Sequence, residues 1–267
     1  MMRSIVLLAG LAVAACGSGS DADVAPRLVE LWSQGVPAFG VFVPSEGERG
    51  APVYTPAIGT RLADNDLLDY LFLNLEGAYD PEAVSAIATG VEAGAGDPTL
   101  LVRIPPVSAD GPEATRQRVA ESLAAGADGI VFPHVRSTQE ARLVVSFMQE
   151  AGADVWSPSN PHGTVLAMIM IEDPGALAEA AEIADVEGYS VLACGIGSLT
   201  RALGDREAGE AGNQRVLAEA KRVGRPDMIT ANAQDVERRI QEGFLGLLMS
   251  GPEADEAIRI GRTAAGR

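Results

Sequence analysis

Residues 165–172 read VLAMIMIE, an uninterrupted apolar run that ends in a glutamate. A run of this length without polar alternation is typical of a parallel β-strand buried on both faces. Seven further segments share this character. They lie at 37–43 (PAFGVFV), 68–76 (LDYLFLNLE), 99–105 (TLLVRIP), 129–135 (GIVFPHV), 189–195 (YSVLACG), 227–232 (DMITAN) and 244–250 (FLGLLMS). The chain is therefore expected to contain eight parallel strands.

Longer segments with helical periodicity separate these runs. Several begin with proline and are followed by glycine (Gly126, Gly152, Gly243), which matches the usual helix boundaries. The predicted helices cover 81–92, 112–125, 138–151, 174–185, 214–223, 233–242 and 253–264, with a weaker one at 55–64. Eight β/α units predict an α/β fold, a single (β/α)₈ or TIM barrel, over residues 28–267. A doubly wound open sheet is the alternative, but no G-x-G-x-x-G turn follows the first run.

Polar side chains stand where several predicted strands end. They are Glu76, Arg103, His134, Glu172, Ser198 just beyond the sixth run, and Asn232. The catalytic residues of (β/α)₈ barrels lie at the carboxyl ends of the strands, which share one face of the molecule. Taken singly, each of these residues is also explained as a solvated strand end or a rim ion pair. As a set, they predict a shared basin that is, or descends from, an active site.

The composition limits the partners of this protein. The chain has 267 residues, with 37 acidic and 20 basic side chains and a formal net charge of −17. Such a chain repels phosphate backbones, and its basic residues are scattered, so nucleic-acid binding is not expected. Cys194 lies in an apolar run, which predicts a buried thiol.

The N-terminal segment has the pattern of a bacterial lipoprotein signal peptide at 1–16. Arg3 precedes an apolar run at 5–15, which is too short to span a bilayer but typical of a signal-peptide core. The letters VAAC end at Cys16 and resemble a lipobox, so Cys16 is the predicted lipidation site and 17–27 a flexible tether. Lipid there would anchor the protein to a membrane of the cell envelope, facing the periplasm or at the outer membrane. The alternative is an ordinary secretory signal with Cys16 incidental.

Five segments carry a family resemblance. They are LLVRIP at 100–105, AAGADGIVFPHV at 124–135, MIMIED at 168–173, ADVEGYSVLACGIGSLTRALG at 184–204 and MITANAQDVERRIQEGF at 228–244. In order and spacing they resemble the HpcH/HpaI aldolase family, metal-dependent class II pyruvate aldolases related to the citrate lyase β subunit. The resemblance implies a TIM barrel, a carbon–carbon lyase activity on a 2-oxo acid, a Mg²⁺ or Mn²⁺ cofactor and assembly into homo-oligomers.

The resemblance also implies roles for individual residues. Glu172 stands at a metal-binding glutamate, and Ser198 stands at the second metal-binding position, an aspartate in the family. Arg103 matches the arginine that binds the pyruvate carboxylate and the enolate oxygen. Backbone amides of Gly197 and Ser198 would complete that carboxylate pocket, and Glu76 matches a glutamate at the end of the second strand.

Several family positions are occupied by residues that lack the family's chemistry. Gly77 stands where the family has a histidine that assists proton transfer, Ala124 stands at an aspartate, and a family loop is shortened to 157–163. Hard divalent cations prefer carboxylate ligands, so Ser198 in place of an aspartate weakens the metal site. The predicted strands and helices therefore resemble the family more closely than the residues at its catalytic and metal-binding positions do.

Other residues could replace part of the lost chemistry. Glu76 leaves a neighbouring strand and could supply a carboxylate, while His134 is the expected substitute base and His162 in the shortened loop is the second choice. A Schiff-base aldolase would need a lysine at the barrel mouth. Lys221 is the only lysine and precedes the seventh run, at the opposite face, which excludes that mechanism.

Two functions stay open at this point. The first is a metal-dependent carbon–carbon lyase acting on a 2-oxo acid, with Arg103 binding the carboxylate and Glu172 anchoring a weakened metal site. The second is a catalytically inactive, envelope-tethered barrel that binds a small oxoacid or a protein partner.

Overall fold

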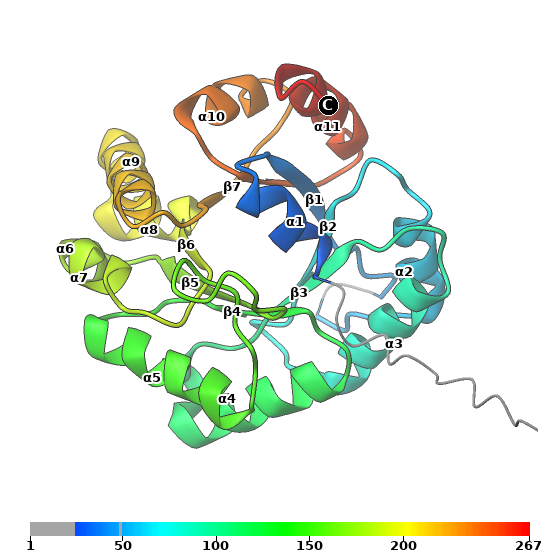
Figure 1. The fold of residues 1–267 in the computed structure, drawn as a ribbon, viewed down its shortest axis with the longest axis horizontal. Helices are drawn as coiled ribbons and strands as arrows, with labels where there is room; N and C mark the ends of the chain where they lie inside the picture. The colour runs from blue at the N-terminus through cyan, green and yellow to red at the C-terminus, as the bar shows by residue number, and fades with distance from the viewer. Residues whose placement is uncertain (1–24, 48–49) are drawn as a thin grey trace, which may run out of the picture.

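The computed structural model describes residues 25–47 and 50–267. Eight parallel strands form a nearly closed barrel with helices around its outside (Figure 1), which confirms the predicted TIM-barrel-like fold. The strands are β1 (Ala38–Phe42), β2 (Tyr70–Asn74), β3 (Thr99–Arg103), β4 (Gly129–Phe132), β5 (Leu166–Ile171), β6 (Val191–Cys194), β7 (Met228–Thr230) and β8 (Gly246–Met249). They pair in the order β6-β5-β4-β3-β2-β1-β8-β7. Every predicted strand is present and shorter than its apolar run.

The helices begin where the sequence supplies caps. Asp80, Ser137, Asp173 and Asp205 each accept a hydrogen bond from a backbone N–H of the first helical turn. The helices are α1 (Arg27–Ser33), α2 (Pro56–Ala63), α3 (Pro81–Glu92), α4 (Val107–Ala124), α5 (Thr138–Glu150), α6 (Pro174–Ala178), α7 (Ala180–Ala184), α8 (Ile196–Leu203), α9 (Arg206–Arg222), α10 (Val236–Glu242) and α11 (Ala254–Ala264).

The helical prediction differs from the structure in several places. The helix predicted at 174–185 is divided into α6 and α7, and α4 and α9 begin before their predicted starts at residues 112 and 214. Neither α1 nor α8 has a counterpart in the prediction.

The predicted signal peptide, Cys16 and the tether up to residue 24 lie outside the described residues. Within the described part of the chain, no helix has both the length and the apolar character needed to cross a membrane.

Helix α1 closes one end of the barrel. We call the end at which the strands begin the base, and the end at which they finish the mouth. Leu28 and Trp32 of α1 are buried in the barrel interior. The indole N–H of Trp32 donates to the carbonyl of Leu245, just before β8 (2.8 Å), and the N–H of Leu28 donates to Oγ1 of Thr99 at the start of β3 (3.0 Å). These contacts place α1 at the base.

A buried carboxylate ties the C-terminus to the base. Asp69 directly precedes β2 and is 1% exposed. It accepts a hydrogen bond from the N–H of Phe39 (2.9 Å) and two from the guanidinium of Arg267 (2.7 Å each). Arg262 adds a further contact at 3.2 Å. All the hydrogen-bonding capacity of this carboxylate is used inside the protein.

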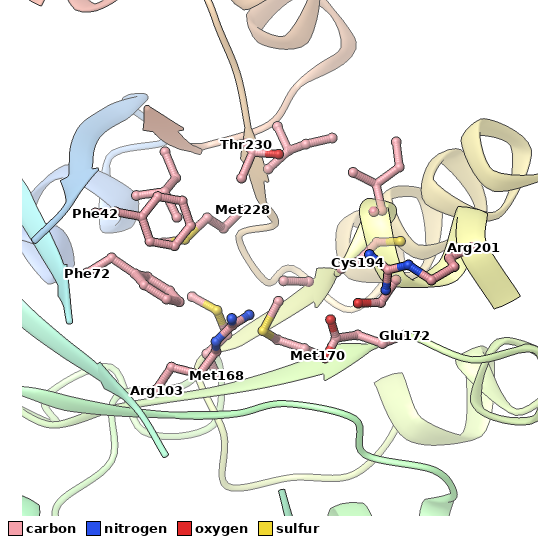
Figure 2. A pocket seen from close by; sticks show the side chains of 17 residues that line it. Phe42, Phe72, Arg103, Met168, Met170, Glu172, Cys194, Arg201, Met228 and Thr230 are labelled. Atoms are coloured by element: carbon pink, nitrogen blue, oxygen red, sulfur yellow. The ribbon is translucent and has the colours of Figure 1, made fainter. Parts of the chain in front are cut away.

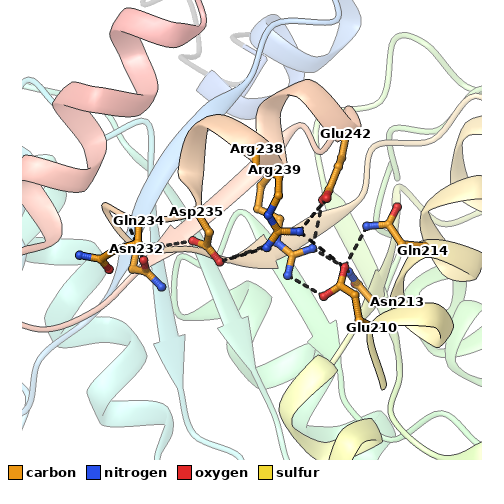
Figure 3. Close-up of polar contacts among 9 residues, drawn as sticks. All are labelled: Glu210, Asn213, Gln214, Asn232, Gln234, Asp235, Arg238, Arg239 and Glu242. Carbon is orange, nitrogen blue, oxygen red and sulfur yellow. Dashed lines mark hydrogen bonds and ion pairs between the residues drawn. The ribbon is translucent and has the colours of Figure 1, made fainter. Parts of the chain in front are cut away.

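The barrel is least continuous between β6 and β7, which form no ladder in the described chain. The N–H of Leu192 donates to the carbonyl of Pro226 there (3.3 Å). Outside this gap, Arg239 of α10 is 4% exposed and makes two hydrogen bonds to Glu210 of α9 (2.6 and 2.8 Å) and one to Glu242 (3.0 Å) (Figure 3). The hydrogen bonds from Arg239 lower the pKa of Glu210 to about 2. Side chains thus hold α9 and α10 together where backbone pairing is weak.

Candidate active site

Four of the predicted residues meet at the mouth of the barrel. Glu76 follows β2, Arg103 ends β3, His134 follows β4 and Glu172 follows β5. The carboxylate of Glu76 contacts Arg103 through Oε2 (2.6 Å to Nη2) and His134 through Oε1 (3.1 Å to Nε2). Because consecutive parallel strands end side by side, residues far apart in sequence form one charged cluster.

Arg103 is oriented by its partner across the ladder. Asn74 and Arg103 are paired in the β2–β3 register, and Oδ1 of Asn74 accepts a hydrogen bond from Nε of Arg103 (2.9 Å). The guanidinium also lies over the ring of Phe72, 5.8 Å from its centroid. These contacts direct the side chain across the mouth, and the sequence-based reasoning did not single out Asn74.

His134 has an unusual backbone conformation. It has a φ of 51°, and it is the sole non-glycine residue with a positive φ in the described chain. Left-handed conformations are uncommon outside glycine and are concentrated at functional sites. The N–H of His134 donates to Oε2 of Glu172 (2.9 Å), and Nδ1 lies 3.4 Å from the same oxygen. The tight turn therefore places the imidazole between two carboxylates.

Glu172 is buried at the wall of the mouth. It is 3% exposed, and Oε1 accepts no hydrogen bond from any described residue. Oε1 lies against Gly195, where an added Cβ would come within 2.1 Å of that oxygen. Glycine at residue 195 is thus required for the carboxylate to take this place. Asp173, which caps α6, points its carboxylate into the helix instead.

Arg103 and Glu172 of this cluster line a cavity of about 240 Å³ inside the mouth (Figure 2). Its wall is largely apolar, with Phe42, Phe72 and three methionines, and its polar side combines Arg103, Glu172 and the first turns of α8. Ser198 lines it as expected, next to Gly197. No side chain caps the start of α8, so its first N–H groups are available to an anion at this end of the cavity.

Cys194 also lines the cavity, and it is chemically quiet. Burial, together with the negative charges of Asp227 and Glu172, raises the pKa of its thiol far above the ordinary value. The thiolate is the reactive form of cysteine. The structure therefore agrees with the expected buried, unreactive thiol.

The donor atoms suit a divalent cation. Glu76, His134 and Glu172 each offer one ligand atom, and these atoms lie within 4.8 Å of one another. Two carboxylates and an imidazole form a mixed oxygen and nitrogen donor set of the kind that binds Mn²⁺, Fe²⁺ or Zn²⁺, whereas Mg²⁺ favours oxygen ligands. Oε1 of Glu172 accepts no hydrogen bond from any described residue, and Glu172 lines the cavity, so this oxygen could serve as a ligand to a cation.

Some predicted residues do not reach the site. Asn232 shapes the turn before α10, where its N–H donates to Asp235 and its Oδ1 accepts from Gln234 (2.8 Å each; Figure 3). His162 lies in the loop before β5, at the end of the barrel where the strands begin. It is therefore too far from the mouth to accept a proton from a substrate there. Lys221 bonds to the carbonyl of Glu242 ahead of β8, also at the base, in agreement with the exclusion of a Schiff-base mechanism.

Comparisons with known proteins agree with this fold. The family description "HpcH/HpaI aldolase/citrate lyase" matches residues 63–249. A family protein from Burkholderia cenocepacia J2315 superposes with a TM-score of 0.68 at 21% identity, covering 91% of this chain and 98% of its own. An HpcH/HpaI aldolase from Desulfitobacterium hafniense DCB-2 gives a TM-score of 0.65 at 22% identity, over 89% and 93%.

A third solved structure was determined with its ligands. The citrate lyase β subunit from M. tuberculosis, in complex with oxaloacetate and magnesium, gives a TM-score of 0.60 at 16% identity, covering 87% of this chain and 98% of its own. At these identities the structural likeness establishes the fold alone. A comparison with curated proteins finds no significant match.

Proposed function

This chain belongs to the HpcH/HpaI aldolase/citrate lyase family, and from that premise we propose that it is a divalent-metal-dependent carbon–carbon lyase acting on a 2-oxo acid. The observation that carries the proposal is the convergence of Glu76, His134 and Glu172 beside Arg103 at the barrel mouth. The oxaloacetate and magnesium bound to the M. tuberculosis structure support the same class of ligand.

The residues divide the work between the cation and the substrate carboxylate. Glu172, Glu76 and His134 would hold the cation, and a cation bound there would act as a Lewis acid that stabilises the enolate of a 2-oxo acid. A carboxylate that gives one oxygen to a cation neutralises a neighbouring cation less fully, so Glu76 as a ligand would leave more positive charge on Arg103. The remaining N–H groups of the guanidinium would then bind the substrate carboxylate, together with the N–H groups of Gly197 and Ser198 at the start of α8.

His134 can act either as a third ligand or as the base that removes the proton from C3 of the 2-oxo acid. The two roles separate in one experiment with His134→Gln. If the imidazole is a ligand, this variant loses cation affinity by about 10–100-fold. If it is the base alone, cation affinity stays and proton removal slows by about 10²–10⁴-fold.

Two measurements on the chain without residues 1–16 test the lyase proposal. Calorimetry with Mn²⁺ reports cation binding, and ¹H NMR in D₂O follows exchange of the pyruvate methyl protons, in which C3 loses a proton and regains a deuteron from solvent. We expect both cation binding and cation-dependent exchange. A protein that neither binds Mn²⁺ nor exchanges these protons is not a lyase of this kind.

A second function is favoured by one observation. Glu76 pairs with Arg103 and contacts His134, which also contacts Glu172, without a ligand, and Ser198 lacks the charge of the family's aspartate. Such a site suits a catalytically inactive barrel that binds an oxoacid. Tight binding of a 2-oxo acid without proton exchange or bond cleavage would identify the protein as this binder.

The proposed location rests on the sequence alone. The pattern before Cys16 supports lipid attachment at that cysteine and an envelope location. The Cys16→Ala variant should move the protein from the membrane fraction to the soluble fraction. Equal membrane recovery of wild type and variant contradicts lipidation at this residue.

A further inference from the structure

The cavity at the mouth contains a second arginine that the lyase proposal does not use. Arg201 of α8 lines the same cavity as Arg103 and Glu172 (Figure 2). Arg103 is paired with Glu76 at 2.6 Å. Arg201, by contrast, is exposed and makes neither an ion pair nor a side-chain hydrogen bond with any other described residue. A guanidinium without an internal partner is available to a ligand.

The charge of the cavity favours an anion with more than one negative group. The ionised side chains that line it are Arg103, Arg201 and Glu172, and Glu76 pairs with Arg103 beside it, so the two arginines are balanced by two carboxylates until a divalent cation binds. The N–H groups at the start of α8 add positive potential. A cation held by Glu172 would raise it further. A locally positive cleft concentrates anionic ligands, and a single carboxylate would leave part of this charge unmatched.

The geometry of α8 separates two anion positions. Arg201 lies three and four residues after Ser198 and Gly197, so all three share one face of the helix. The Cα atoms of Gly197 and Arg201 differ by about 6 Å along the helix axis, at 1.5 Å per residue, and the arginine side chain leans back toward the first turn. The two anion positions therefore lie within the length of a short aliphatic chain.

We propose that Arg201 binds a second carboxylate, and that the site selects 2-oxo dicarboxylic acids over 2-oxo monocarboxylic acids of equal length. The proposal rests on the proposed function, because it places the first carboxylate at Arg103 and the start of α8. It adds the substrate class and assigns the discrimination to one residue.

The test compares two ligands that differ only in the terminal group. Calorimetry in Mn²⁺-containing buffer measures the Kd of 2-oxoglutarate and of 2-oxopentanoate for wild type and for Arg201→Gln. We expect wild type to bind the dicarboxylate about 10–100-fold more tightly, and the preference to fall to about threefold or less in Arg201→Gln. Arg201→Lys should retain part of the preference, since it keeps the charge.

Arg206 provides a matched control. It is an exposed arginine in the first turn of α9 that lines the adjoining cavity and not this one, so Arg206→Gln should keep the full dicarboxylate preference. If both variants lost the dicarboxylate preference equally, the preference would depend only on the overall charge of the protein. That result would overturn the proposal.

The outcomes separate this inference from the lyase assignment. If wild type shows no dicarboxylate preference, or if Arg201→Gln retains it, the role of Arg201 is wrong even when pyruvate protons exchange. If the preference is present and lost in Arg201→Gln while wild type catalyses no exchange, Arg201 holds the second carboxylate and the lyase proposal fails.

Discussion

The base and the mouth of the barrel each contain a buried carboxylate, and the two are used in opposite ways. Asp69 at the base accepts hydrogen bonds from Phe39, Arg262 and Arg267. Glu172 at the mouth is almost as buried, yet it accepts one hydrogen bond from the N–H of His134 and keeps Oε1 without a partner among the described residues.

The difference shows what separates a structural carboxylate from a functional one. Burying a charge is costly unless it is paired and hydrogen-bonded, and Asp69 meets that condition entirely within the protein. Glu172 meets it only in part, through His134, because it also faces the cavity that Arg103 and Arg201 line. Spare acceptor capacity next to an open cavity is therefore the physical mark of the site.

The largest effect is expected from Asp69→Ala. Removing one partner of a buried ionic network typically costs about 3–5 kcal/mol of stability, because Arg267 and the N–H of Phe39 lose their acceptor. Chemical denaturation measures the free energy of unfolding. Asp66→Ala, an exposed aspartate three residues earlier, should change it by less than about 0.5 kcal/mol. A loss below about 1 kcal/mol for Asp69→Ala would mean that the base does not depend on this network.

Glu172→Gln should cost function and not stability. Glutamine keeps an oxygen acceptor for the N–H of His134 but removes the charge that a cation needs, so the Mn²⁺ affinity should fall at least about 100-fold. The melting temperature should stay the same or rise. Glu187→Gln, at an exposed residue ahead of β6, serves as the control for both measurements. A marked drop in melting temperature would place Glu172 with Asp69 among the structural carboxylates.

Asp128→Asn tests a carboxylate at the base of the barrel that forms no ion pair with any described residue. Asp128 accepts a hydrogen bond from the N–H of Leu100 (2.7 Å), and burial raises its pKa from an ordinary value of 3.8 to about 6. Between these two values the folded state alone binds the proton, so stability falls as the pH rises through that window and is constant above it. The variant, which keeps an oxygen acceptor, should gain about 2 kcal/mol relative to wild type between pH 4 and pH 7.5.

Denaturant unfolding at several pH values provides the measurement for Asp128→Asn. Parallel stability curves for variant and wild type across this range would show that Asp128 keeps an ordinary pKa in the folded protein. In that case a partly buried carboxylate at the base of the barrel would stay ionised without an arginine partner.

The smallest effect is expected from Ser198→Asp, which restores a carboxylate beside Glu172. The added charge at the start of α8 should tighten Mn²⁺ binding by about tenfold. Ser198→Asn, of the same size without the charge, should leave the affinity near that of wild type. Equal affinities for the two variants would mean that the cation, if bound, does not lie within reach of residue 198.

The strands could be predicted because each is an apolar run with a sharp polar end. That pattern also brought Glu76, Arg103, His134 and Glu172 together, since the ends of parallel strands share one face. Their pairing could not be predicted, because it depends on the β2–β3 register and on the left-handed turn at His134.

The regions that escaped prediction have local signals that oppose their structure. Gly209 and Gly212 have low helix propensity, yet both lie in α9. Their lack of a side chain lets α9 pack closely on α8, since an added Cβ would collide with Thr200 or Leu199. Glycines at 195 and 197 likewise lowered the apparent helix propensity of α8, so neither this helix nor the place of Arg201 on it was predicted. Asn232 follows β7 at the mouth as predicted, but its hydrogen bonds shape the turn before α10. His162 lies in a loop at the opposite end of the barrel. Turns and loops carry the same residue types as a site, so the sequence did not distinguish them.

Both described ends of the chain are secured at one pole of the molecule. Helix α1 packs there through Trp32, and Arg267 is clamped there by Asp69. A fusion partner or a purification resin attached directly ahead of α1 or beyond Arg267 would lie at the base of the barrel, away from the mouth. Small solutes then enter and leave on the far side without crossing the attachment, so the protein can be immobilised by either end with its cavity facing outward.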